Sequence, residues 1–137
     1  MANSKYRIVL NSNIFISFLV FNGIQRMLIQ IVKQSDIKII TSFPILAETL
    51  EVLRKKFKYS ESELQIAKNE VLKFSEIVYP SKHLNIVRDK EDNKVIEAAI
   101  EANCNFIITG DKDLLVMGKY QDINIVSTAE FLDLISE

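Results

Sequence analysis

The chain has 137 residues, 48% of them hydrophobic and 26% charged, which is typical of one compact domain spanning residues 1–137. Its formal net charge is −1, so nucleic-acid binding would need a local patch or a bound metal. A single cysteine, Cys104, excludes a disulfide framework, and a single histidine, His83, argues against zinc or histidine-based catalysis. The chain starts polar and has no apolar run of bilayer-spanning length, so we expect a cytoplasmic protein without a membrane partner.

The first third of the chain predicts two strands separated by helical segments. A β-rich run predicts a strand over residues 6–10, and the apolar run IFISFLVF after it favours a helix ending at Asn22-Gly23, with a strand extension as the alternative. From Ile24 an amphipathic pattern predicts a helix, and residues 37–40 predict the second strand. Ser42 then caps a helix with Glu48 near its start and the basic run RKKFK at its end.

The rest of the chain continues the alternation. Ser60 and Glu63 form a capping box for a helix to about residue 77, after which Pro80 ends the helix and residues 84–87 predict a third strand. A helix over about 92–103 and a buried strand over 105–109 follow, then a fifth strand over 123–126 and a closing helix capped by Ser127. This order predicts a parallel sheet with helices on both faces. Only three glycines are present, which excludes a P-loop and a GxGxxG turn.

Acidic and amide side chains follow the ends of successive predicted strands. They are Asn11 and Asn13 after the first strand, Glu48 after the second, Asp92 after the third, and Asp111 and Asp113 after the fourth. In an open parallel sheet these positions meet at one edge, where ligands bind. Carboxylates that converge repel by roughly 4 kcal/mol per pair at about 4 Å, so a cation is expected among them. Oxygen ligands without His or Cys favour Mg²⁺ or Mn²⁺, and metal-assisted phosphodiester hydrolysis is the natural chemistry.

Each of these residues also has a purely structural interpretation. Asp89 or Asp92 alone could be a helix N-cap, and Gly110-Asp111 could be an ordinary turn. Glu48 lies off the apolar face of its helix and could be a solvated side chain. The basic run could bind an RNA backbone, but it also satisfies the helix dipole, and Lys90, Lys94 and Lys112 beside the acidic residues are better phosphate-contact candidates.

Four segments together resemble a known family: NSNIFISFL, SFPILAETLEVL, RDKEDNKVIEAAI and FIITGDKDLL. The chain is similar over nearly its whole length to the PIN-domain family, in particular to its VapC-like branch of toxin ribonucleases. The resemblance implies a three-layer α/β/α fold with a five-stranded parallel sheet in the order 3-2-1-4-5. It maps the family's metal site onto Asn11, Glu48, Asp92 and Asp111, with Asp113 a further candidate. It also implies RNA cleavage with Mg²⁺ or Mn²⁺, a homodimer and a small antitoxin partner.

The first motif departs from the family, which usually has Asp-Thr-Asn where this chain has Asn11-Ser12-Asn13. An amide oxygen can bind a cation but adds no charge, so activity is expected to be weakened, by natural change or by a deliberate substitution that disarms a toxic enzyme. The alternative is a decayed PIN-like module that binds only RNA or a protein. Receiver domains and haloacid-dehalogenase phosphatases fit poorly, because both need an aspartate at the end of the first strand.

Overall fold

The computed structural model describes residues 6–21 and 23–136, so the predicted helix end at Asn22 lies outside the described residues. Helices and strands alternate in the order β1 (Tyr6–Leu10), α1 (Ser12–Val20), α2 (Ile24–Gln34), β2 (Ile37–Ser42), α3 (Phe43–Lys55), α4 (Glu61–Phe74), β3 (Ser75–Val78), α5 (Lys90–Glu101), β4 (Phe106–Ile108), α6 (Lys112–Met117), β5 (Lys119–Tyr120), β6 (Ile123–Val126) and α7 (Thr128–Ile135). The apolar run after β1 is therefore helical, as favoured.

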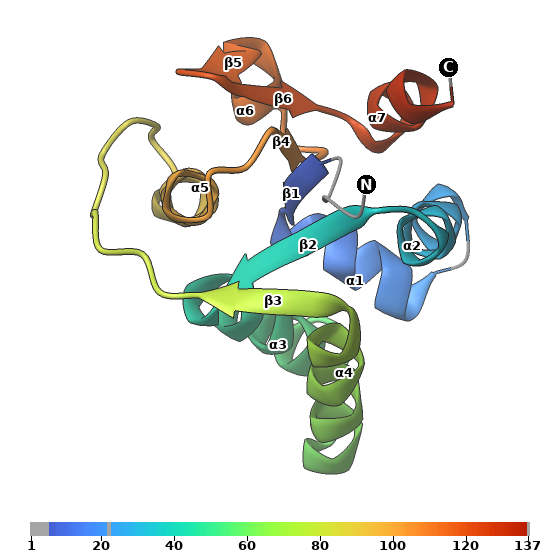
Figure 1. The fold of residues 1–137 in the computed structure, drawn as a ribbon. Helices are drawn as coiled ribbons and strands as arrows, with labels where there is room; N and C mark the ends of the chain where they lie inside the picture. Colours follow the sequence, from blue (N-terminus) through green and yellow to red (C-terminus); the bar gives the residue numbers. More distant parts are fainter. Residues whose placement is uncertain (1–5, 22, 137) are drawn as a thin grey trace.

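The strands form one sheet in the order β3-β2-β1-β4-β6-β5 (Figure 1). The first five in this order are parallel, which confirms the α/β class, and they follow the predicted order 3-2-1-4-5. The sheet is nevertheless six-stranded and mixed, and not five-stranded and parallel as predicted. The sixth, β5, is a two-residue strand that pairs antiparallel with β6 and was not predicted. It follows α6, and only two residues separate it from β6, so the pair forms a tight hairpin at the edge of the sheet.

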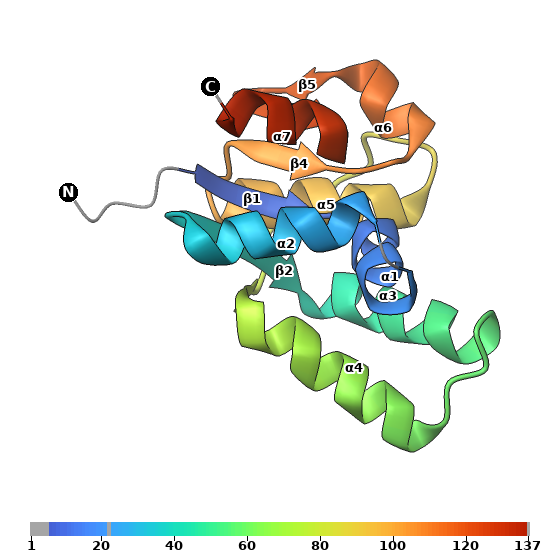
Figure 2. The same ribbon diagram turned by 90° about the vertical axis from the view of Figure 1, so that its right-hand side faces the viewer.

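Helices cover both faces of the sheet, with α5 on one face and α2 and α7 on the other (Figures 1 and 2). The core is centred on β1 and β4, whose apolar side chains are buried on both faces, as expected for a central parallel strand. Ser42, Ser60 and Ser127 cap α3, α4 and α7 as predicted. No single helix in residues 6–21 or 23–136 is long and apolar enough to span a bilayer. Among these helices, only α1 and α2 taken together have that length and composition, and they are bent by 102°.

The third strand was placed wrongly from the sequence. It is β3, at Ser75–Val78, and α4 ends at Phe74 rather than near residue 77. Ser75 is extended, and the β-branched residues Ile77 and Val78 pair with the last two residues of β2. Pairing with an existing strand thus outweighs the helical pattern that appeared to continue through these residues.

Residues 84–87, predicted as that strand, belong to a loop that is held by hydrogen bonds to side chains of α5. The amide of Leu84 donates to Glu97 Oε2 at 2.7 Å, and the amides of Ile86 and Val87 donate to Asn93 Oδ1 at 2.7 and 3.0 Å. Side chains of α5 thus satisfy backbone groups that a strand would satisfy in a ladder. In consequence, Asp92 reaches the sheet edge from the start of a helix that follows a loop, and not directly from a strand.

Candidate active site

A cavity of about 390 Å³ lies beside the carboxyl ends of β1 and β4. We call it the acidic cavity, after the polar side chains that line it: Asn11, Glu48, Asp89, Asp92 and Asp111, together with Ser12 and Asn13. Three helix starts and one helix face supply these groups, because Asn11, Asp89 and Asp111 are the N-caps of α1, α5 and α6. Polar side chains that follow the strand ends thus lie together in this cavity, as expected at the carboxyl edge of a parallel sheet.

Asn11 is buried and its amide has a fixed orientation. Its Oδ1 accepts a hydrogen bond from the amide of Ser12 at 2.7 Å, and its Nδ2 donates to Thr109 Oγ1 at 2.8 Å. A flipped amide would place a donor against the Ser12 N–H, so this assignment follows from the hydrogen bonds. The same Thr109 oxygen accepts from the amide of Asp111 at 3.0 Å. Thr109 therefore links Asn11 to Asp111 across neighbouring strands.

Two aspartates of the cavity are N-caps and remain candidate ligands, so the structural and functional interpretations coexist. Asp111 Oδ2 accepts from the amide of Leu114 at 3.0 Å, and Asp89 Oδ1 accepts from the amide of Glu91 at 2.9 Å. In each carboxylate the capping bond holds one oxygen and fixes the direction of the side chain. The sequence indicates only a capping role for Asp89, because nothing in its spacing predicts that it lines the cavity.

Asp92 is the most unusual ionisable group of the cavity. It is 5% exposed, and its Oδ2 is buried without a hydrogen-bond partner among the described residues. Burial raises the pKa of Asp92 from its usual 3.8 to about 7, assisted by the charge of Asp111 and a hydrogen bond to it, and then by the charges of Asp89 and Glu48. A buried carboxylate with one unpartnered oxygen is costly, so this position favours either a bound proton or a bound cation.

Glu48 is half-buried, so it is not the fully solvated side chain that its place off the apolar face also allowed. It accepts a hydrogen bond from Ser12 Oγ at 2.7 Å. Burial raises the pKa of Glu48, the bond from Ser12 opposes this, and the charges of Glu91 and Asp89 add to it. Glu48, Val52 and Lys56 recur at every fourth residue of α3 and its C-cap, and all line the cavity. Glu48 lies off the apolar stripe because its face of α3 lines the cavity and does not pack into the core.

Asp113 lies outside the acidic cavity. It is in the first turn of α6, and its Oδ2 accepts a hydrogen bond from the guanidinium of Arg88 at 3.0 Å in an exposed ion pair. The structure thus brings four predicted site residues together, Asn11, Glu48, Asp92 and Asp111, and separates the fifth. The sequence pattern does not predict α6, and without that helix nothing distinguishes the place of Asp111 from that of Asp113.

The residues of the cavity fit a divalent cation in kind. Four carboxylates and the amide oxygen of Asn11 are hard donors, and Oδ2 of Asp92 has no hydrogen-bond partner among the described residues. In residues 6–21 and 23–136, no three His, Cys, Asp or Glu side chains already stand close enough together to enclose a metal. Mutual repulsion favours separation of such carboxylates, and an amide occupies the place of one of them. The side chains would therefore have to move together around an ion.

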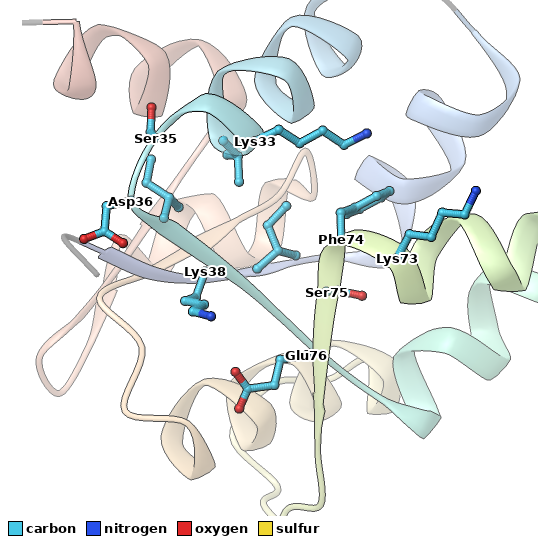
Figure 3. Close-up of a pocket in the computed structure, with 11 residues that line it drawn as sticks. Lys33, Ser35, Asp36, Lys38, Lys73, Phe74, Ser75 and Glu76 are labelled. Carbon is cyan, nitrogen blue, oxygen red and sulfur yellow. The ribbon is translucent and has the colours of Figure 1, made fainter. Parts of the chain in front are cut away.

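A larger cavity, about 590 Å³, lies at the opposite edge of the sheet, around the start of β2 and the end of α4. Lys33, Lys38 and Lys73 line it together with Phe74, and the Lys33 ammonium is 5.8 Å from the Phe74 ring centroid (Figure 3). No buried side chain of that cavity lacks a hydrogen-bond partner in the described part of the chain. Cavity size alone would favour this one as the active site, but the buried carboxylate oxygen without a hydrogen-bond partner lies in the acidic cavity.

Known proteins resemble this chain in sequence and in structure. An uncharacterized protein of Methanocaldococcus jannaschii, MJ1680, is 36% identical over 132 residues, which cover 90% of this chain and 84% of that protein. A chain from the crystal structure of VapBC2 of Rickettsia felis, bound to a DNA fragment from their promoter, has a TM-score of 0.64 at 15% identity and covers 87% of this chain and 96% of its own. A chain of VapBC-1 from nontypeable Haemophilus influenzae has a TM-score of 0.63 at 14% identity, covering 90% and 98%.

The two solved structures establish a shared fold, because their sequence identities to this chain are low. The family relationship rests on the sequence itself, which matches the PIN domain over residues 7–113. That range contains the strands from β1, apart from its first residue, to β4 and all four predicted residues of the acidic cavity. The fold, the strand order and the sequence agree, and the chain belongs to the PIN domain family.

Proposed function

We propose that this protein is a metal-dependent endoribonuclease that hydrolyses phosphodiester bonds of RNA and serves as the toxin of a toxin–antitoxin pair. The observation that carries the proposal is Asp92, a buried carboxylate with an unpartnered oxygen beside Asp111, in a cavity open to a substrate. Such a group is unfavourable unless a cation or proton occupies the site in function. Family membership and the VapBC complexes among the structural relatives support the same function.

Asn11, Glu48, Asp92 and Asp111 are the residues that would hold Mg²⁺ or Mn²⁺ in this proposal. The bound ion would polarise the phosphoryl group and lower the pKa of the attacking water. The chain itself orients the donors: Ser12 directs Glu48 and Asn11, and Thr109 joins Asn11 to the backbone of Asp111. Because Asn11 is neutral, we expect weaker metal binding and weaker cleavage than a carboxylate would give.

The second candidate is a decayed module that binds RNA or protein without cleaving it. One observation favours it: Nδ2 of Asn11 donates to Thr109, so the first position of the site is satisfied without a cation. A metal titration separates the two functions, since a decayed site binds Mn²⁺ poorly.

We also propose a small antitoxin partner and a homodimer in the cytoplasm. The VapBC complexes among the structural relatives support an antitoxin. The exposed apolar side chains Ile24 and Met27, on the α2 face away from the core, support an interface between copies. A single cysteine and an RNA substrate suit a reducing compartment.

Cleavage of a labelled single-stranded RNA with and without Mn²⁺ tests the enzymatic proposal. We expect cleavage that EDTA abolishes and that Asp92→Asn lowers by about a hundredfold or more. Asp113→Asn is the matched control, because the same chemical change there lies outside the cavity, and it should retain activity. Cleavage that persists in EDTA, or that both substitutions reduce alike, refutes a metal site at Asp92.

A further inference from the structure

Aromatic and basic side chains from the ends of α1 and α3 form one wall of the acidic cavity. Phe21, Phe57 and Lys56 line it. The two rings meet edge to face, with centroids 5.9 Å apart and an interplanar angle of 76°, and the Lys56 ammonium lies 5.9 Å from the Phe57 centroid. Phe21 comes from the end of α1 and the other two from the end of α3, so residues far apart in sequence build one surface.

We propose that this wall is a nucleotide subsite, in which a base of single-stranded RNA stacks on Phe21 and an adjacent phosphate contacts Lys56. The proposal deepens the ribonuclease function and rests on it. The carboxylate side of the cavity takes the reacting phosphate, and the aromatic wall takes the neighbouring base. An unstacked base is available only in single-stranded RNA, so the subsite selects single strands over duplexes.

Exposure supports this role for Phe21. Phe21 is 55% exposed, so part of its ring is open to solvent although it meets the ring of Phe57 edge to face. A large apolar ring exposed beside a charged cavity has a hydration cost that a stacked base would remove, and stacking tolerates every base. The site would therefore contribute affinity and strand preference rather than a strict sequence preference.

The charges of the cavity support the role of Lys56. It is the one basic residue lining a cavity with four acidic ones, and it belongs to none of the ion pairs found in residues 6–21 and 23–136. The two residues before it in the basic run differ, since Arg54 and Lys55 both pair with Glu51. The lysines favoured from the sequence, Lys90, Lys94 and Lys112, do not line the cavity. An RNA phosphate would supply Lys56 with the anion that it lacks.

Equilibrium binding of a fluorescent single-stranded oligoribonucleotide tests the subsite. The parent for the measurement is Asp92→Asn in Mg²⁺, so that binding is read without turnover and independently of whether the enzyme cleaves. A second oligonucleotide carries abasic positions in place of the bases. We expect Phe21→Ala to weaken binding of the normal strand about tenfold and of the abasic strand hardly at all, and Phe21→Tyr to restore binding. Lys56→Ala should weaken both strands and reduce the salt slope by about one.

Two substitutions outside the cavity serve as matched controls. Phe43→Ala removes a ring that is 49% exposed near the other end of α3, and Lys38→Ala removes an exposed charge at the opposite sheet edge. Neither should change affinity much. The subsite is overturned if the control substitutions weaken RNA binding as much, or if Phe21→Ala leaves the affinity unchanged. It is also overturned if Phe21→Ala weakens binding of the abasic strand equally, or if the parent does not bind RNA. If Phe21→Ala and Lys56→Ala leave RNA binding intact but disrupt a complex with a protein partner, the wall is a protein-docking surface instead.

Discussion

At the scale of single residues, Asn11 sets the charge of the site while its neighbours preserve the geometry. Replacing it with aspartate puts an oxygen where Nδ2 now donates to Thr109. The Thr109 hydroxyl accepts from both Asn11 and Asp111, so its own hydrogen can turn to donate to the new oxygen. We expect Asn11→Asp to raise Mn²⁺ affinity and cleavage by roughly tenfold or more, because only charge is added. Calorimetric titration with Mn²⁺ and the cleavage assay measure both.

The metal-free protein should respond in the opposite direction. An added charge near Asp92 and Asp111 increases repulsion, so the melting temperature of Asn11→Asp should fall in EDTA and recover with Mn²⁺. Asn124→Asp, which adds the same charge at an exposed position of β6, should neither lower the melting temperature in EDTA nor raise it with Mn²⁺. If Asn11→Asp changes neither metal affinity nor metal-dependent melting, Asn11 is not a ligand.

Asp92 should make the stability of the metal-free protein depend on pH. Its pKa rises from 3.8 to about 7 on folding, so between these values the folded state binds more protons than the unfolded state. Stability is therefore greatest below pH 3.8 as far as this group is concerned, and it is lost as pH rises through 7. We expect the free energy of unfolding in EDTA to fall between pH 5 and pH 8 by on the order of 2 kcal/mol.

Urea unfolding of the parent and of Asp92→Asn at both pH values measures this dependence. The substitution removes the titrating group, so most of the pH-dependent loss should disappear, and saturating Mn²⁺ should suppress it in the parent. An unchanged pH dependence in Asp92→Asn would show that another group causes it.

The sequence predicted the buried carboxylate but not its surroundings. Asp92 lies on the same helical face as Val95 and Ile96, and this spacing correctly indicated burial. Thr109 carries no sequence signal for its bridging role, because a threonine at a strand end is commonplace. That role depends on Asn11 and Asp111 lying on either side of it, which only the sheet register decides.

At the scale of elements, the loop before α5 carries Asp89 to the cavity, and Asn93 holds it. Asn93 is 3% exposed, accepts from the amides of Ile86 and Val87, and donates to the carbonyl of Val87 at 3.0 Å. Asn93→Ala leaves these groups without their partner, so we expect a loss of roughly 2–3 kcal/mol in stability. Asn69→Ala, at an exposed position of α4, should cost much less stability.

Hydrogen exchange gives a local measurement of the same loop. The amides of Ile86 and Val87 should exchange faster in Asn93→Ala, and cleavage should fall as Asp89 and Asp92 lose their support. Unchanged protection of both amides would mean that the loop holds its conformation without Asn93.

Elements were predicted well where local signals and tertiary contacts agree, and poorly where they differ. The capping boxes at Ser60 and Ser127 are local, and both are present. The prediction of the third strand was wrong because residues 84–87 resemble a strand in composition, while their backbone amides donate hydrogen bonds to side chains of α5. The short α6 and β5 depend on the chain turning back along β6, which no pattern within a few residues reveals.

At the scale of the whole molecule, the strand order followed from family resemblance, and the alternation of elements supplied only the parallel class. Residues far apart in sequence meet at the cavity because β1 lies between β2 and β4. Alternation of strands and helices permits several orders, so composition and periodicity could not have placed Asn11 beside Asp111. The fold was therefore predictable mainly through the motifs at the strand ends.

The exposed face of α2 leads to a prediction about assembly. Ile24 and Met27 are 42% and 54% exposed on a strongly amphipathic helix whose other face packs against the core. Covering these side chains with a second copy would remove apolar surface from water. We therefore expect a homodimer at micromolar concentration in sedimentation, and we expect Met27→Glu to shift it to monomer with little change in melting temperature. Ile66→Glu, on α4 and 68% exposed, is the matched control and should leave the dimer intact. A parent that sediments as a monomer, or a dimer that Met27→Glu does not weaken, would rule out this face as the interface.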